Sequence, residues 1–282
     1  MVELALVVSH REGMSMKKTV LLLMLGAVLS ASCAVNIEYK KEVRKNREYN
    51  NYRILNSAPV KYNIDYVISE RNGKKTVGDS SAASTGIGLN SGWYQGGSLR
   101  IFVNGRSLTA PAKVERKGDT MVFTWEKAVL KMVFPEGSEK IYCHVSAPGA
   151  KQVKLGFLGM PGFLPKRKTE YKSYVSTSKI NHSLNDGNYV SQGESWFMLY
   201  DLESNRRGIP VIILDPAEVK SGEASGGPKR LLVTAQFEMK KTDCRFVLMG
   251  VPSGHMDAET LYEDLKANGE KYLDALKKFQ FK

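Results

Sequence analysis

The residues with the clearest potential for chemistry lie in a polar stretch, residues 180–189, which contains His182, Asn188 and Tyr189. In β-elimination of an acidic polysaccharide, a His or Tyr side chain removes the proton next to the carboxylate, and an Arg or Lys side chain stabilises the anion that forms. Arg206 lies further along the chain and would supply that positive charge. These residues make polysaccharide β-elimination one hypothesis, with ordinary polar loop positions as the alternative.

Asp201 is the acidic candidate for glycoside hydrolysis, a reaction that uses two carboxyl groups. The two groups stand about 5–5.5 Å apart in retaining enzymes and about 6.5–9.5 Å apart in inverting enzymes. Glu194 would lie more than ~20 Å from Asp201 if the residues between them are extended, at ~3.3 Å per residue. A partner such as Asp215 would have to come from the tertiary fold. We therefore expect these carboxylates to be surface groups or turn caps.

Trp93 and Tyr94 are the best candidates for binding a sugar. They lie in a glycine-rich stretch, GWYQGG at residues 92–97, which can present flat aromatic rings to the apolar face of a sugar. Arg167 and Asn188 would add a positive charge and an amide that hydrogen-bonds hydroxyl groups. The alternative is that both rings fold back and fill one end of the protein core.

Motifs for metals, nucleotides and nucleophilic catalysis are absent from the sequence. His144 and His255 stand apart, and no HxH, HExxH or DxDxDG pattern occurs. Residues 193–196 begin like the GxSxG nucleophile elbow, but Phe197 takes the place of the second glycine. The glycine-rich segments do not follow P-loop or Rossmann spacing. We therefore expect no metal and no cofactor.

The N-terminus predicts export. Lys17 and Lys18 precede an apolar run, residues 20–29, and small residues follow it. The run is shorter than the ~20 residues of a membrane-spanning helix, and the pattern is that of a secretory signal peptide over residues 1–34. Residues 1–15 resemble an upstream extension, with the natural start at a later methionine.

Two routes of signal removal stay open. The tripeptide SCA at 32–34 fits a small-x-small cleavage site, which would leave Val35 as the N-terminus. Residues 30–33 also resemble a bacterial lipobox, and lipidation of Cys33 would anchor the protein to a membrane. A lipobox has leucine three residues before the cysteine, whereas Leu29 stands four before it. On either route the mature protein lies outside the cytoplasm, and a lipid anchor would be its only membrane attachment.

The chain of 282 residues is basic, with a net charge of +12 and a pI near 9.4. Residues 1–34 hold three basic and two acidic side chains, so the mature chain carries +11. Outside the cytoplasm, a basic surface meets anionic glycans, lipid headgroups or peptidoglycan rather than nucleic acid. A glycan, with anionic character, is therefore the expected partner, and simple solvation by lysine is the alternative explanation of the charge.

Cys143 and Cys244 are the two cysteines that follow the signal segment. An oxidising compartment permits a disulfide between them. Both lie in apolar, strand-like runs, so a pair of buried, inert thiols is the alternative.

The mature chain consists mostly of short apolar runs with alternating polarity, separated by Gly, Asn, Asp and Ser, which is typical of antiparallel β-structure. Asn104-Gly105 predicts a tight hairpin turn. We expect strands over residues 61–68, 99–103, 120–125, 128–134, 141–146, 153–158, 196–200, 209–214, 231–238 and 244–251. This spacing predicts an all-β fold, a large antiparallel two-sheet β-sandwich, over residues 35–256. The stretches 79–97, 159–194 and 215–229 are expected to be long loops.

A helix is expected only at the C-terminus, over residues 257–282. Asp257 can cap it, and Asn268-Gly269 would interrupt it. Its apolar stripe would pack on the sandwich and comprises Leu261, Leu265, Tyr272, Leu276 and Phe279.

The long series of strands, the aromatic-bearing loops and the segment WFMLYD at 196–201 resemble the two-sheet sandwich of galactose-mutarotase-like and polysaccharide-lyase-associated domains of secreted bacterial proteins. The resemblance implies a sugar-facing sandwich and carries over no catalytic residue. Our first hypothesis is a non-catalytic carbohydrate-binding protein of the bacterial envelope. The alternatives are a carbohydrate-active enzyme, such as a lyase, an epimerase or a glycosidase, and a structural envelope protein or lipoprotein without a small ligand.

Overall fold

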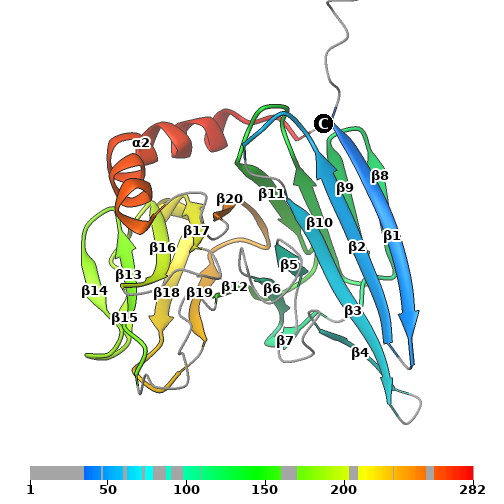
Figure 1. The fold of residues 1–282 in the computed structure, drawn as a ribbon, viewed down its shortest axis with the longest axis horizontal. Coiled ribbons are helices and arrows are strands. Elements are labelled where there is room, and N and C mark those ends of the chain that lie inside the picture. The colour runs from blue at the N-terminus through cyan, green and yellow to red at the C-terminus, as the bar shows by residue number, and fades with distance from the viewer. Residues whose placement is uncertain are drawn as a thin grey trace, which may run out of the picture. The chain divides into compact units, whose positions relative to one another are not determined.

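The computed structural model describes residues 35–45, 47–59, 62–71, 74–78, 87–89, 98–108, 110–159, 170–202, 209–230, 232–251 and 257–281. Within these ranges the chain forms strands in two antiparallel sheets, followed by one long α-helix (Figure 1). The predicted all-β, two-sheet sandwich with a C-terminal helix is confirmed. The predicted signal peptide, with Cys33, lies outside the described residues.

The larger sheet has eleven strands in the described part of the chain, and all its pairs are antiparallel. Nine strands form its main path, in the order β1 (Asn36–Arg44), β2 (Arg47–Leu55), β3 (Asn63–Arg71), β5 (Ile87–Leu89), β6 (Ser98–Val103), β12 (Val153–Gly159), β19 (Val233–Met239), β18 (Val219–Ser225) and β15 (Tyr189–Val190). Two short strands flank this path: β4 (Lys74–Gly78) pairs with β3, and β7 (Arg106–Ser107) pairs with β6.

The second sheet has nine strands in the described residues, again all antiparallel. Their order is β14 (Asn181–Ser183), β13 (Ser173–Thr177), β16 (Trp196–Asp201), β17 (Ile209–Leu214), β20 (Asp243–Val251), β11 (Ile141–Ser146), β10 (Ala128–Val133), β9 (Thr120–Trp125) and β8 (Lys113–Lys117). A short 3-10 turn, η1 (Pro216–Glu218), follows β17.

The main apolar core lies between the two sheets, because alternate residues of each strand point to the partner sheet. In β9, for example, Met121, Phe123 and Trp125 are buried, while the residues between them are half-exposed. In the larger sheet, Tyr52 and Ile64 belong to the same core. Each buried side chain of this kind stabilises the fold by ~1.5–3 kcal/mol, so the period-two pattern is the main determinant of the sandwich.

The expectation of long loops over 159–194 and 215–229 is partly wrong. Three strands, β13, β14 and β15, form within 173–190, and β18 occupies 219–225. β14 and β15 are edge strands of three and two residues, respectively, so they are too short to show the alternation that marks an internal strand. The first two strands of the larger sheet, β1 and β2, were also not predicted, because their outward positions are charged and their hydrophobic pattern is sparse.

The C-terminal helix, α2 (Ala258–Lys278), begins as expected, with the Asp257 carboxylate accepting a hydrogen bond from the Thr260 N–H at 2.7 Å. The predicted interruption at Asn268-Gly269 is wrong, because the helix is continuous through both residues. Gly269 is buried, and a Cβ atom there would lie 2.5 Å from Cδ1 of Trp196 on β16. The glycine therefore allows the helix to approach the sheet closely. No helix in the described ranges combines the length and apolar character that a membrane span requires.

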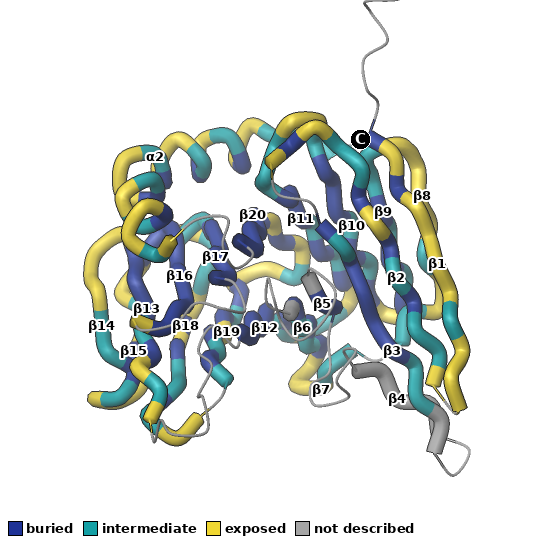
Figure 2. The backbone as a smooth tube through the Cα atoms, in the orientation of Figure 1, coloured by how far each residue is buried: buried dark blue, intermediate teal, exposed yellow. Residues whose placement is uncertain are grey.

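The apolar stripe of α2 covers the outer face of the second sheet, as predicted. Figure 2 shows buried residues on α2 and on β16, β17 and β20 beneath it. This second cluster contains Leu261, Leu265 and Leu276 of the predicted stripe, together with Leu273, which the stripe did not include. Tyr272 and Phe279 of the stripe pack at its margin.

The disulfide between Cys143 and Cys244 is not formed, and both thiols are free and buried. In the register of β11 and β20, Cys143 pairs with Phe246 and Cys244 pairs with Val145, so the cysteines are diagonal neighbours. Diagonal positions on paired strands lie roughly 7–8 Å apart, whereas disulfides need Cα atoms within about 6.8 Å. The alternative prediction, two buried thiols, is the one confirmed.

Candidate functional site

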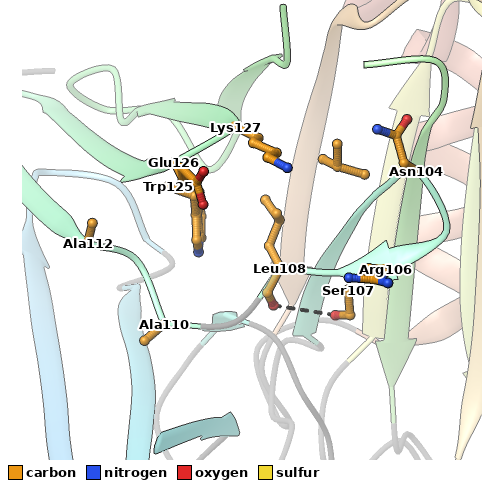
Figure 3. Close-up of a pocket in the computed structure, with 10 residues that line it drawn as sticks. Asn104, Arg106, Ser107, Leu108, Ala110, Ala112, Trp125, Glu126 and Lys127 are labelled. Atoms are coloured by element: carbon orange, nitrogen blue, oxygen red, sulfur yellow. Dashed lines mark hydrogen bonds between the residues drawn. The ribbon is translucent and has the colours of Figure 1, made fainter. Parts of the chain in front are cut away.

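A pocket of about 710 Å³ lies at one end of the sandwich, between two hairpins that belong to different sheets (Figure 3). One wall is the β6–β7 hairpin with the segment that follows it, and the other is the β9–β10 turn. Its polar and aromatic lining consists of Asn104, Arg106, Ser107, Trp125, Glu126 and Lys127. The volume is in the range of small-molecule sites, about 300–1,000 Å³.

The β6–β7 hairpin is positioned by its two-residue turn. Asn104 and Gly105 both have positive φ, 51° and 79°, which is the backbone of a type I′ turn and confirms the predicted hairpin. The side-chain oxygen Oδ1 of Asn104 also accepts hydrogen bonds from the backbone N–H groups of Lys151 at 2.7 Å and Gln152 at 3.1 Å. These bonds hold the hairpin against the segment that joins β11 to β12. The backbone of Arg106, which follows the turn, is therefore fixed in place.

The opposite wall is positioned by the β9–β10 hairpin, in which Trp125 pairs with Ala128. Because both of these side chains point into the core, the two turn residues between them, Glu126 and Lys127, are left exposed. Figure 3 shows Lys127 reaching toward the middle of the pocket from this turn, with Leu108 reaching in from the other side.

Trp125 is the fixed aromatic element of the site. Its side chain is only 9% exposed and stacks on Phe123, with ring centroids 6.1 Å apart and an interplanar angle of 20°. Phe123 in turn packs edge-on against Tyr66 of the larger sheet. Because packing holds the indole on its core side, it presents an immobile edge to a ligand at little cost in conformational entropy.

The charged side chains of the pocket are unengaged. Arg106, Glu126 and Lys127 are exposed, and none of them makes a hydrogen bond or ion pair with another residue of the described ranges. Charged groups without partners next to a rigid aromatic edge suit a small polar ligand. Glu126 is the one carboxylate among the described lining residues, so this wall lacks the carboxylate pair that glycoside hydrolysis needs.

The structure does bring together His182 and Tyr189, the two residues predicted for β-elimination. They lie on β14 and β15, edge strands of opposite sheets, and their ring centroids are 5.5 Å apart. Tyr189 is buried, and its hydroxyl donates to the Glu194 carboxylate. Burial and this carboxylate raise the pKa of Tyr189, so its hydroxyl stays protonated at neutral pH and is a poor general base.

Glu194 is a buried carboxylate whose role the sequence did not reveal. Besides Tyr189, it accepts hydrogen bonds from the Ser191 hydroxyl at 2.7 Å and from the Gln192 backbone N–H at 2.9 Å. Burial by itself would raise the pKa of Glu194, but these hydrogen bonds hold it below its usual value. Glu194 therefore organises the segment between β15 and β16 and is not available as a catalytic acid at neutral pH.

Asp201 and Asn188 are each used within the fold. The Asp201 carboxylate is buried and accepts a hydrogen bond from the Lys172 backbone N–H at 2.9 Å. β13 lies between Asp201 on β16 and His182 on β14, and Asp201 is offset from His182 by two residues along the strand direction. At ordinary strand spacing, their backbones are therefore roughly 12 Å apart. The Asn188 amide donates to the Glu223 carboxylate at 2.6 Å. None of these residues lines the Trp125 pocket.

Four other predicted residues, Trp93, Tyr94, Arg167 and Arg206, lie outside the described residues. The pocket residues themselves were missed, although both of their hairpins were predicted. A tryptophan at the end of a strand, followed by a two-residue charged turn, was the available signal. The sequence could not show that this turn meets the Asn104-Gly105 hairpin of the other sheet.

Comparison with protein-family models finds no match to this chain. Comparison with curated proteins finds no match either. Within the described residues, no group of three or more His, Cys, Asp or Glu side chains is placed to hold a metal ion. The Trp125 pocket is therefore the feature of the structure from which a function is best inferred.

Proposed function

We propose that this protein is an exported, non-catalytic carbohydrate-binding β-sandwich protein of the bacterial envelope, and that the Trp125 pocket is its sugar site. The observation that carries the proposal is the composition of this pocket. A rigid indole edge lines the same pocket as the amide of Asn104, the hydroxyl of Ser107 and unengaged charged side chains. Sugars combine apolar C–H faces with hydroxyl groups, and this combination matches them.

The proposal of binding without catalysis is supported by the chemistry of the described lining. It has a single carboxylate, Glu126, and contains no His, Tyr or Cys side chain. The His182–Tyr189 pair, which would support the alternative of a lyase, has its tyrosine hydroxyl engaged by Glu194. Export follows from the signal-peptide pattern, and the mass of the exported chain would distinguish a free Val35 N-terminus from a lipidated Cys33.

The proposal is tested by filling the pocket. Ala112 is exposed and lines it, so Ala112→Trp adds bulk to the site without removing a core contact. Ala267 is exposed on α2 and outside the pocket, so Ala267→Trp is the matched control. Isothermal titration of the mature chain against neutral and acidic oligosaccharides should show saturable binding that Ala112→Trp weakens at least about tenfold, or 1.4 kcal/mol. The control should bind normally.

Three results would contradict the proposal. No heat from any oligosaccharide at millimolar concentration would favour the structural envelope protein. Equal binding by Ala112→Trp and Ala267→Trp would place the site elsewhere. Release of reducing ends or of unsaturated products from the same oligosaccharides would show an enzyme.

A further inference from the structure

We propose that the Trp125 pocket selects sugars that carry an acid group, and that Arg106 and Lys127 together bind this group. This inference rests on the proposed function and adds the class of ligand to it. The two cations come from different sheets, Arg106 from β7 and Lys127 from the β9–β10 turn, and both line the same pocket (Figure 3).

The first observation in support concerns the ion pairs that basic side chains form. Some basic side chains elsewhere in the described residues are paired with carboxylates: Lys277 lies 3.4 Å from Asp215, and Lys154 and Lys220 both lie within 3.4 Å of Glu238. Arg106 and Lys127 have no such partner in the described part of the chain. Two cations brought to one pocket repel each other, and an anion bound between them would remove that repulsion.

The second support is the complementarity of the two groups. A guanidinium can donate two parallel hydrogen bonds to the two oxygens of a carboxylate or sulfate, which orients the ligand. An ammonium acts as a point charge that tolerates either anion. The nearby apolar surface of Trp125, Leu108 and Val103 excludes water from one side, which strengthens a charge-assisted hydrogen bond.

Glu126 lies on the same β9–β10 turn as Lys127, and its negative charge repels a bound anion. The direction in which its removal changes affinity is therefore a test of the inference. With Arg106, Lys127 and Glu126, the lining residues that the structure describes carry a net charge of +1. Glu126→Gln should therefore tighten an acidic ligand, by about two- to fivefold for an exposed charge, and leave a neutral ligand unchanged. Weaker binding of the acidic ligand by this variant would overturn the inference.

The main experiment compares three matched ligands by isothermal titration with the mature chain. They are a trigalacturonate, the same trisaccharide with its carboxyl groups reduced to alcohols, and a sulfated form of the reduced trisaccharide. We expect the two acidic ligands to bind at least about tenfold more tightly than the neutral one. Preference for the carboxylate over the sulfate, or the reverse, identifies the acid group.

Three variants show where the selectivity resides. Arg106→Gln and Lys127→Gln should each reduce affinity for the acidic ligands by about tenfold and leave the neutral affinity unchanged. Lys117→Gln is the matched control, because Lys117 is exposed on β8 and lies at the opposite end of the β9 strand from the pocket. All three positions are exposed, so the variants should keep the stability of the parent within about 0.5 kcal/mol.

The outcomes separate this inference from the proposed function. Equal or tighter binding of the neutral trisaccharide overturns acid selectivity and leaves sugar binding intact. An equal loss with Lys117→Gln shows attraction to net charge and overturns the assignment to Arg106 and Lys127. Absence of binding by all three ligands overturns the proposed function itself.

Discussion

Replacing Gly269 by alanine should have two opposing effects on the stability of the protein. In an exposed helix interior, alanine is more favourable than glycine by about 0.8–1.0 kcal/mol. At this position, however, the added Cβ would stand 2.5 Å from Cδ1 and 2.6 Å from Nε1 of Trp196. Ordinary contact begins near 3.4 Å, so the helix or the indole must move by about 0.9 Å.

Neither partner can move without disturbing other packing. Trp196 is 2% exposed on the outer face of the second sheet and packs edge-on against Tyr262 of α2, with ring centroids 6.0 Å apart. On the helix, Leu265 and Leu273 flank Gly269 and are buried against the same sheet. Overpacking of a filled core costs typically ~1–3 kcal/mol. We therefore expect Gly269→Ala to lower the free energy of unfolding by up to about 2 kcal/mol, once the gain in helix propensity is subtracted from the cost of overpacking.

Urea unfolding followed by circular dichroism measures this effect, and two further variants isolate its cause. Ala267→Gly, at an exposed position of the same helix, gives the propensity effect alone and should cost about 1 kcal/mol. In a Trp196→Ala background the clash is absent, so Gly269→Ala should become neutral or stabilising. Stabilisation by Gly269→Ala in the parent chain would refute the close approach of α2 to β16.

Three other predictions concern the helix, the buried carboxylate and the thiols. Deleting α2 and the residues after it should expose the outer face of the second sheet and cause aggregation or a large loss in melting temperature; a truncation that melts like the parent would show that the helix contributes no stability. The pKa of Glu194 is lowered by folding, so its contribution to stability is present above pH 4.5 and is lost as the pH falls through the lower, folded-state value. The difference in urea midpoint between the parent and Glu194→Gln should therefore shrink below pH 4.5, and a pH-independent difference would contradict the assignment. Burial raises the pKa of both Cys143 and Cys244, so neither thiol should react with a disulfide reagent until the protein unfolds; rapid labelling of the native protein would contradict their burial.

The sequence by itself determined the fold class and the elements whose signals are local. Alternation of apolar and polar residues over 120–125 and 128–134 predicted β9 and β10, because a half-buried strand has a side-chain period of two. Asn104-Gly105 predicted its hairpin because the turn needs two residues with positive φ. Asp257 predicted the start of α2 because a carboxylate can accept from the first free N–H groups of a helix.

The tertiary structure alone decided the features that depend on contacts between distant segments. In the sequence, Gly269 predicted a break in the helix. In the fold, a glycine is needed there because a Cβ atom would collide with the indole of Trp196, which is distant in the chain. The sequence left both a disulfide and two buried thiols open for Cys143 and Cys244, and the register of β11 and β20 placed the two cysteines diagonally.

In the candidate site, too, the sequence predicted the local elements, and the tertiary structure decided which side chains meet. His182 and Tyr189 are close in the sequence and close in space, yet the Tyr189 hydroxyl is engaged by Glu194 through a bond that no residue pattern specifies. Arg106 and Lys127 belong to hairpins that the sequence predicted separately, and the packing of one sheet on the other brings both into a single pocket. Local signals fix strands and turns because neighbouring residues determine them, whereas a site formed by two sheets depends on how those sheets pack.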